Sequence, residues 1–240
     1  MANYPNKQVV INQPYFLGDI IFVMAVVQKY INDGDDVIYP VRDEYMSLQK
    51  NFPMVNLVPL SKFTQYEMFN NVQPVVEGLT HVAISFRHSY TRTRNETKTM
   101  SNKYECLGFP VDMWRDFEFV RDNEKEMELF NHLGLKEGDK YNLINEFHRP
   151  FLQKTAPIVV ENGNKNVFMS VIEGYNLFDW VGVWEKAQTI HSVATSMHYI
   201  LDTVDSMPEE MHIYRRVREG GGFRDHSDYE HLYHKKFIYH

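Results

Sequence analysis

The first forty residues place a strand, a helix and a second strand in close succession, and this order constrains the fold more than any other feature of the chain. Segment 8–12 (QVVIN) is a short run rich in β-branched residues, and a loop containing Gly18 follows it. Apolar residues then recur at helical spacing, at Ile20, Met24, Val27 and Ile31. Gly34 ends this helix, and segment 36–40 (DVIYP) is typical of a strand. Such a β-α-β unit builds a parallel sheet, so the sequence predicts an α/β fold.

Strands and helices continue to alternate along the rest of the chain. Further strands are predicted at 55–60, 81–86, 140–147, 167–170, 188–193 and 212–217. A short helix is predicted at 44–51, and further helices are predicted from Asn123, from Asn176, and from Thr195 or Ser196. The order of elements therefore occurs twice, which favours two small Rossmann-like halves with mainly parallel sheets.

The two halves define the expected domains. We expect an N-terminal, acceptor-side domain at 1–138 and a C-terminal domain that binds a nucleotide sugar at 139–219. Gly220, Gly221 and Gly222 interrupt regular structure. The polar, aromatic and histidine-rich segment 220–240 is therefore expected to be a C-terminal tail.

Composition excludes several classes of protein. Hydrophobic residues form 43% of the 240 residues, which is enough for a packed core and excludes a disordered chain. The formal net charge of -7 argues against general affinity for nucleic acid. A single cysteine, Cys106, excludes an internal disulfide and a cysteine-based zinc site. Because the N-terminus lacks the pattern of a secretory signal and the longest apolar run, 20–27, is too short to span a bilayer, we expect a cytoplasmic protein without a membrane span.

Two turns between the end of a strand and the start of a helix carry candidate functional groups, and open α/β sheets bind ligands at such turns. The first is segment 13–20 (QPYFLGDI). Gly18 allows the backbone to approach a ligand closely, and Asp19 places a carboxylate where it can take a proton from an attacking hydroxyl. The alternative is that Asp19 only caps its helix and Gly18 only turns the chain. The spacing leaves both interpretations open.

The second turn is segment 191–198 (HSVATSMH). Ser192, Thr195 and Ser196 bring three hydroxyls to the free amides of a helix start, which favours binding of a phosphate. Helix capping accounts for one hydroxyl only. His191 is the first residue of this segment, and it is either a functional group there or a histidine buried in the core.

Other segments add weaker candidates. Segment 87–103 has five Lys or Arg, one Glu and no apolar periodicity, so it is expected to be a mobile surface loop. Glu173 follows a predicted strand and can bind sugar or ribose hydroxyls, or it is a solvated loop carboxylate. The pair His231 and His234 lacks a supporting zinc motif, so no metal site is expected. No GxGxxG, GxxxxGK[ST] or GxSxG motif is present.

At these turns the sequence resembles glycosyltransferases of GT-B architecture, particularly the heptosyltransferase-like group. The resemblance rests on VVINQPYFLGDIIFVMAVV and DWVGVWEKAQTIHSVATSMHYILDTV and covers about residues 8–40 and 167–217. In that group the Asp of a GD turn after the first strand acts as catalytic base, which implies this role for Asp19. The late segment corresponds to the strand, loop and helix that hold the donor diphosphate. Here His191 and Ser192 stand where that group has an acidic residue before the hydroxyl, and the chain is shorter than a full enzyme of this type.

The resemblance implies transfer of a sugar from a nucleotide-diphosphate sugar to an acceptor hydroxyl, with inversion and without a metal or other cofactor. Asp19 would be the base, and His191 would help to neutralise the leaving group. The expected donor contacts are Gly18, Glu173, Ser192, Thr195 and Ser196. The expected acceptor contacts are Arg87, Arg92 and Arg94, and the acceptor is a glycan, a lipid-linked sugar or a modified nucleic acid.

Two other functions remain open from the sequence. The first is a non-catalytic protein that binds a nucleotide or sugar, or serves in assembly, on the same scaffold, because a fold does not imply a function. The second is a glycosyltransferase that modifies nucleic acid and uses the basic segment 87–103 as the acceptor contact. The net negative charge disfavours this second alternative.

Overall fold

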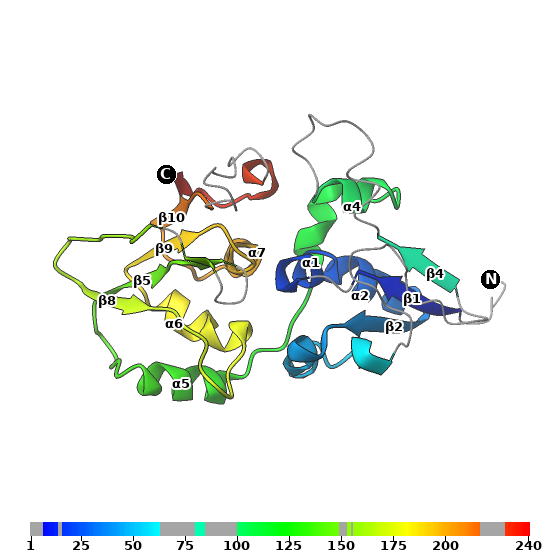
Figure 1. Cartoon of the computed structure of the whole chain (residues 1–240), viewed down its shortest axis with the longest axis horizontal. Helices are drawn as coiled ribbons and strands as arrows, with labels where there is room; N and C mark the ends of the chain where they lie inside the picture. Colours follow the sequence, from blue (N-terminus) through cyan, green and yellow to red (C-terminus); the bar gives the residue numbers. More distant parts are fainter. Residues whose placement is uncertain are drawn as a thin grey trace. The chain divides into compact units, whose positions relative to one another are not determined.

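A computed structural model describes residues 7–13, 16–62, 80–84, 100–148, 153–154, 156–216 and 229–240. The chain divides into two compact units, Met1–Val120 and Arg121–His240. Each unit has its own main sheet, and every strand pair in these two sheets is parallel. The expected α/β fold with two mainly parallel sheets is therefore confirmed (Figure 1).

The sheet of the first unit has the strand order β3-β2-β1-β4. Its strands are β1 (Gln8–Asn12), β2 (Asp36–Val41), β3 (Asn56–Pro59) and β4 (Thr80–Ala83). The central strand β1 pairs with β2 on one side and with β4 on the other. Because the chain runs outward from β1 to β3 and then returns to β4, the strand order reverses between β1 and β4.

Helices of the first unit continue the predicted pattern after β1. The predicted helix is divided at Val23 into α1 (Leu17–Phe22) and α2 (Met24–Asn32). Short helices follow at η1 (Asp43–Lys50), η2 (Leu60–Lys62), α4 (Asn102–Glu105) and η3 (Val111–Asp116). The ring of Phe22 stacks on Trp114 at 5.5 Å and meets the edge of Tyr104 at 5.3 Å. These aromatic contacts hold α4 and η3 against α1.

The sheet of the second unit has the strand order β11-β10-β9-β5-β8. Its strands are β5 (Tyr141–Asn145), β8 (Lys165–Phe168), β9 (Thr189–Val193), β10 (Met211–Tyr214) and β11 (Ile238–Tyr239). A small antiparallel pair, β6 (Phe147–His148) and β7 (Gln153–Lys154), follows β5. The chain moves from β5 outward to β8 and then back to β9, so the strand order reverses between β5 and β9.

Helices α5 (Asn123–His132) and α6 (Val181–Glu185) pack together beside this sheet (Figure 1). The hydroxyl of Tyr141 in β5 donates to the carbonyl of Val183 in α6 at 2.6 Å. Asn176 caps η4 (Leu177–Trp180) as predicted. In α5 the capping side chain is Asp122, which accepts from the Lys125 N–H, so the helix begins at Asn123 but is not capped by it. The remaining helices are α7 (Met197–Thr203) and η6 (Glu230–Leu232).

The unit boundary and the C-terminal segment differ from the expected domains. The boundary lies between Val120 and Arg121 and not at 138, because α5 packs against α6 and η4 of the second unit. Residues 229–240 are part of the second unit and do not form a separate tail. Their strand β11 pairs with β10, and the buried Asp202 carboxylate accepts the N–H groups of His234 and Lys235.

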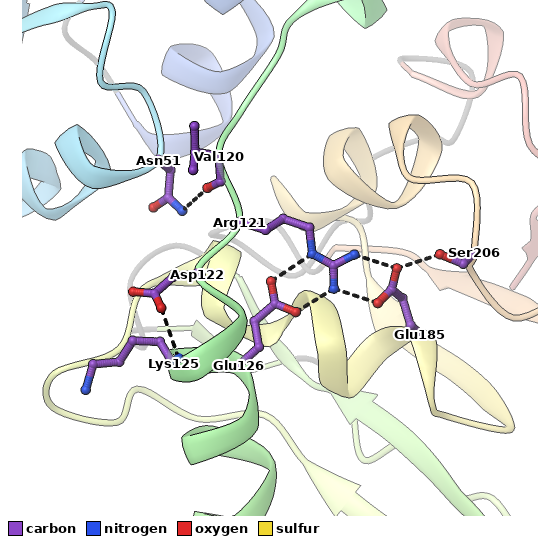
Figure 2. A network of polar contacts seen from close by, with 8 residues as sticks. All are labelled: Asn51, Val120, Arg121, Asp122, Lys125, Glu126, Glu185 and Ser206. Atoms are coloured by element: carbon purple, nitrogen blue, oxygen red, sulfur yellow. Dashed lines mark hydrogen bonds and ion pairs between the residues drawn. The ribbon is translucent and has the colours of Figure 1, made fainter.

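The connection between the units is anchored on both sides of the boundary (Figure 2). In the first unit, Val120 exchanges two hydrogen bonds with Asn51, at 2.8 and 2.9 Å. In the second, the Arg121 guanidinium binds the carboxylates of Glu126 and Glu185 at 2.5 to 2.9 Å. Hydrogen bonds to Glu126 and Glu185 raise the pKa of Arg121. Burial alone would raise the pKa of Glu185, but hydrogen bonds from Arg121 and Ser206 lower it below its ordinary value.

We expect Arg121→Met to lower the free energy of unfolding of the second unit by about 1.5–3 kcal/mol, because charge-assisted hydrogen bonds are lost and the buried Glu126 carboxylate keeps no cation. Urea denaturation measures this change. Lys125→Met is the matched control, since it removes a cation from an exposed ion pair with Glu128, and it should leave the stability essentially unchanged. Equal stability of Arg121→Met and the wild type would contradict the prediction.

Candidate functional site

Each sheet has one place where the strand order reverses, and open α/β sheets bind ligands at the carboxyl ends of the strands there. In the first unit this place, the first switch point, is formed by the ends of β1 and β4. In the second unit it is formed by the ends of β5 and β9, the second switch point. The first predicted turn, 13–20, follows β1, and the second, 191–198, begins in the last residues of β9.

At the first switch point, Asp19 lies in the first turn of α1 with its side chain 13% exposed. Its Oδ2 atom accepts the N–H of Phe16, the residue before the helix, at 3.3 Å. Its Oδ1 atom forms a short ion pair with the Lys103 ammonium group. A carboxylate offers about four lone-pair positions, so the two partners found among the described residues leave room for a further donor. Asp19 therefore supports the helix start, and its arrangement also permits contact with a hydroxyl.

Lys103 was not among the site residues predicted from the sequence. It ends the basic segment 87–103 that was expected to be a surface loop, but it lies in α4 and its side chain is only 4% exposed. Arg87, Arg92 and Arg94, the expected acceptor contacts, lie outside the described residues. Because Lys103 is 84 residues from Asp19 in the sequence, no local pattern could have indicated their pairing.

Gln13 also belongs to the first switch point, since it directly follows β1. Its side chain is fully buried, and in the described part of the chain neither the amide nitrogen nor the amide oxygen has a hydrogen-bond partner. The Tyr39 hydroxyl donates to the Gln13 backbone carbonyl at 3.2 Å. Burial, and next the charge of Asp19, raise the pKa of Tyr39. Tyr39 thus bonds to the Gln13 backbone and lies close enough to Asp19 for its pKa to depend on that charge.

We expect Gln13→Met to raise the free energy of unfolding by about 1–2 kcal/mol, because a buried carboxamide without partners destabilises the folded state and methionine has a similar volume. Thermal or urea denaturation measures the gain. Asn51→Leu is the control, because the Asn51 amide does donate to Val120, and it should destabilise the protein. A loss of stability in Gln13→Met would show that the carboxamide has partners in solution.

At the second switch point, two side chains from neighbouring strands are paired. Asn145 at the end of β5 donates its Nδ2 to the Ser192 hydroxyl at 3.0 Å, and that hydroxyl donates to the carbonyl of Val193 at 2.8 Å. Ser192 is also fully buried, so its hydroxyl bonds to protein groups and is not accessible to a ligand. Thr195 and Ser196 are partly exposed at the start of α7, and the Ser196 side chain makes no capping hydrogen bond. Two of the three predicted hydroxyls thus remain accessible.

Arg216 adds a positive charge to this turn. It follows β10, and its Nε donates to the carbonyl of Ala194 in a short hydrogen bond. The guanidinium therefore lies next to the segment that holds Thr195 and Ser196. From the sequence, the three hydroxyls and His191 were predicted to hold the donor, although two arginines at the end of a predicted strand were a visible signal.

His191 lies within β9, on the opposite face of the sheet from Ser192, because neighbouring residues of a strand alternate. Its ring contacts the Thr189 hydroxyl at 3.0 Å and the Tyr214 hydroxyl at 3.2 Å, and it stacks on His212 at 4.2 Å. Burial, and next the charge of His212, lower the pKa of His191 to about 4. The imidazole is neutral at pH 7, so it lacks the charge expected of a group that neutralises a leaving diphosphate.

Glu173 is exposed in a turn after β8, next to Gly174 with its positive φ of 85°. It has no hydrogen-bond partner among the described residues. His231 and His234 are exposed as well. Among the residues that the structure describes, no three His, Cys, Asp or Glu side chains are grouped so that they could hold a metal. No helix in the described segments is both long enough and apolar enough to cross a membrane.

Comparison of the structure with solved proteins gives matches among glycosyltransferases. The glycosyl transferase family 9 protein of Veillonella parvula matches over 89% of this chain and 83% of its own, with a TM-score of 0.52 and 12% identity. The iron-containing dodecameric glycosyltransferase TibC of enterotoxigenic E. coli matches over 88% of this chain and 58% of its own, with a TM-score of 0.48 and 8% identity. No protein-family profile and no curated protein sequence matches the chain. The first match confirms the fold that the resemblance implied.

Proposed function

We propose that this protein is a glycosyltransferase that moves a sugar from a nucleotide-diphosphate sugar to an acceptor hydroxyl. The observation that carries the proposal is the Asp19 carboxylate, held by Lys103 at the first switch point of a two-unit fold shared with a glycosyl transferase family 9 structure. Ligands bind at the carboxyl ends of the strands at such switch points, and Asp19 lies at the first of them and the α7 turn at the second.

In the proposed reaction Asp19 is the general base. The acceptor hydroxyl loses its proton to the carboxylate while its oxygen forms a bond to the anomeric carbon of the sugar. The bond from that carbon to the diphosphate oxygen breaks in the same step, and the nucleoside diphosphate leaves with the electron pair. Direct attack opposite the leaving group inverts the anomeric centre.

The second unit holds the donor in this proposal. Thr195 and Ser196 offer accessible hydroxyls at the start of α7, and Arg216 supplies a positive charge beside them. These groups offset the charge that develops on the leaving diphosphate, and so no divalent cation is required. Ser192 supports the turn through Asn145, and Glu173 is exposed for contact with a sugar or ribose hydroxyl. His191 is left out of the proposed site because it is neutral and lies on the opposite face of the sheet.

The competing function is a protein that binds a nucleotide or sugar without turnover. It is favoured by the internal use of Ser192 and His191, two of the groups that the sequence had assigned to the donor. Both functions predict binding of a nucleoside diphosphate to the second unit, and only the first predicts chemistry.

A panel of nucleotide sugars separates the two functions. UDP-glucose, GDP-mannose, ADP-glucose and dTDP-glucose are tested by thermal shift, since a ligand at 100 times its Kd stabilises the fold by about 2.7 kcal/mol. Release of UDP, GDP, ADP or dTDP is then measured with water and with methyl glycosides as acceptors, with and without EDTA. A shift together with release that depends on Asp19 supports the enzyme. A shift without release supports the binding protein, and no shift with any donor would overturn both.

A further inference from the structure

We propose that Lys103 is a positioning residue for Asp19, whose ammonium group holds the carboxylate in the orientation in which it takes the acceptor proton. The inference rests on the proposed function, because it takes Asp19 to be the base. Lys103 lies outside the segments that carry the family resemblance, 8–40 and 167–217.

The contacts of Asp19 hold its carboxylate from two sides. The Lys103 ammonium pairs with Oδ1, and the Phe16 N–H reaches Oδ2 at 3.3 Å. One partner comes from α4 and the other from the residue before α1. Rotation of the carboxylate about its side-chain bonds would break both contacts. The lone pairs that no described residue occupies therefore keep one direction relative to α1.

Helix α4, which carries Lys103, is attached to the helix that carries Asp19. The Tyr104 hydroxyl donates to the Phe22 carbonyl at 2.6 Å, and the Tyr104 ring meets the Phe22 ring edge-on. Both Tyr104 and Phe22 are fully buried. The residue next to Lys103 is thus attached to the same helix that carries Asp19, so the ion pair joins two elements that are already in contact.

A purely structural role does not account for the lysine. Burying an ion pair is rarely more stabilising than apolar packing of the same volume, because both charges lose their hydration. The attachment of α4 to α1 is already provided by the Tyr104 and Phe22 contacts. What Lys103 adds to these contacts is a cation on the Asp19 carboxylate. A group that must act with its oxygens in one direction requires such a contact, since small displacements in a catalytic site reduce rates strongly.

The activity test compares Lys103→Met with the matched control Lys29→Met, which makes the same change in an exposed ion pair with Asp33. Release of UDP from UDP-glucose, GDP from GDP-mannose and ADP from ADP-glucose is measured well below both melting temperatures. We expect kcat to fall about 10- to 100-fold in Lys103→Met, with unchanged Kd for the nucleoside diphosphate. Lys29→Met should change neither the melting temperature nor kcat, because exposed ion pairs contribute little. Unchanged kcat in folded Lys103→Met, with Asp19→Asn inactive, would overturn the proposal.

A second readout needs no turnover. In protein labelled with ¹⁵N, the amide signal of Phe16 reports its hydrogen bond to Asp19. Lys103→Met should move this signal and speed its hydrogen exchange, whereas Lys29→Met should leave it in place. An unmoved Phe16 amide in Lys103→Met would overturn the positioning role. If Asp19→Asn retained full turnover, the proposed base would fail, and the Phe16 signal would still decide whether Lys103 orients the carboxylate.

Discussion

Asparagine at position 19 should reduce the rate of sugar transfer by about 10²–10⁴-fold, the range assigned to general base catalysis. The amide has the size of the carboxylate but does not accept a proton from an attacking hydroxyl. The proposed donor contacts, Thr195, Ser196 and Arg216, all lie in the second unit. Affinity for the nucleoside diphosphate should therefore persist, and the loss should be in kcat.

The same substitution should also affect stability, and the reason is Lys103. If Asp19 only supported the helix start, asparagine would serve nearly as well, because its oxygen also accepts the Phe16 N–H. The ion pair changes this expectation. Removing the carboxylate leaves the buried Lys103 ammonium without its partner, which costs about 3–5 kcal/mol in comparable cases. The double variant Asp19→Asn/Lys103→Met removes both charges and should recover most of this stability while remaining inactive.

Two measurements on folded protein decide the role of Asp19. Melting temperatures identify the conditions in which each variant is folded, and transfer is then measured below the lowest of them. Asp33→Asn is the matched control, because it makes the same chemical change in an exposed ion pair with Lys29 and should alter neither quantity. Full turnover in Asp19→Asn would remove Asp19 from the mechanism.

Much of the fold could be predicted because local patterns dominate it. The strand at 8–12 was predicted with its observed bounds, and 36–40 falls one residue short of β2. The predicted starts at Asn123 and Asn176 correspond to α5 and η4. In contrast, β11 has only two residues, which is too few for a periodicity to be visible in the sequence. It forms by pairing in parallel with β10. That pairing depends on the three-dimensional structure and leaves no local signal.

The candidate site was predictable only where it depends on turns. Asp19 and Ser196 stand at helix starts, which capping and turn residues indicate. The ion pair of Lys103 with Asp19 could not be foreseen, because a lysine in a basic stretch is the same in sequence whether it is solvated or buried. His191 illustrates the opposite case. Its place before a turn favoured a functional role, but the parallel register of β9 and β10 sets it opposite His212 and buries it.

Burial of His191 should make the stability of the second unit depend on pH. The pKa of His191 is about 4 in the folded protein, against an ordinary value of 6.5. Between pH 4 and 6.5 the unfolded chain therefore binds more protons at this position than the folded chain, and acid favours unfolding. The stability that the neutral His191 ring contributes is fully present above pH 6.5 and is lost as the pH falls toward 4. This difference in pKa lowers the free energy of unfolding by about 3 kcal/mol below pH 4, relative to neutral pH.

The surroundings of the ring explain why it resists protonation. Its two nitrogens face the Thr189 and Tyr214 hydroxyls, and neither hydroxyl carries a negative charge to favour an imidazolium. His212 stacks on the ring and itself contacts His240 at 2.8 Å and Glu210 at 2.9 Å. After burial, Coulombic interactions with His212 and His240 lower the pKa of His191, and the Glu210 carboxylate offsets this effect only in part.

The prediction is tested with His191→Asn, which keeps a polar group between the two hydroxyls but does not titrate. Urea denaturation at pH 7 and pH 4.5 gives the free energy of unfolding of both proteins. Other groups also titrate in this interval, so the informative quantity is the difference between the two pH dependences. The wild type should lose about 2 kcal/mol more than His191→Asn between these pH values. Equal losses would mean that the His191 ring is protonated as readily in the folded protein as in the unfolded chain, and that a charged imidazole is available beside the α7 turn after all.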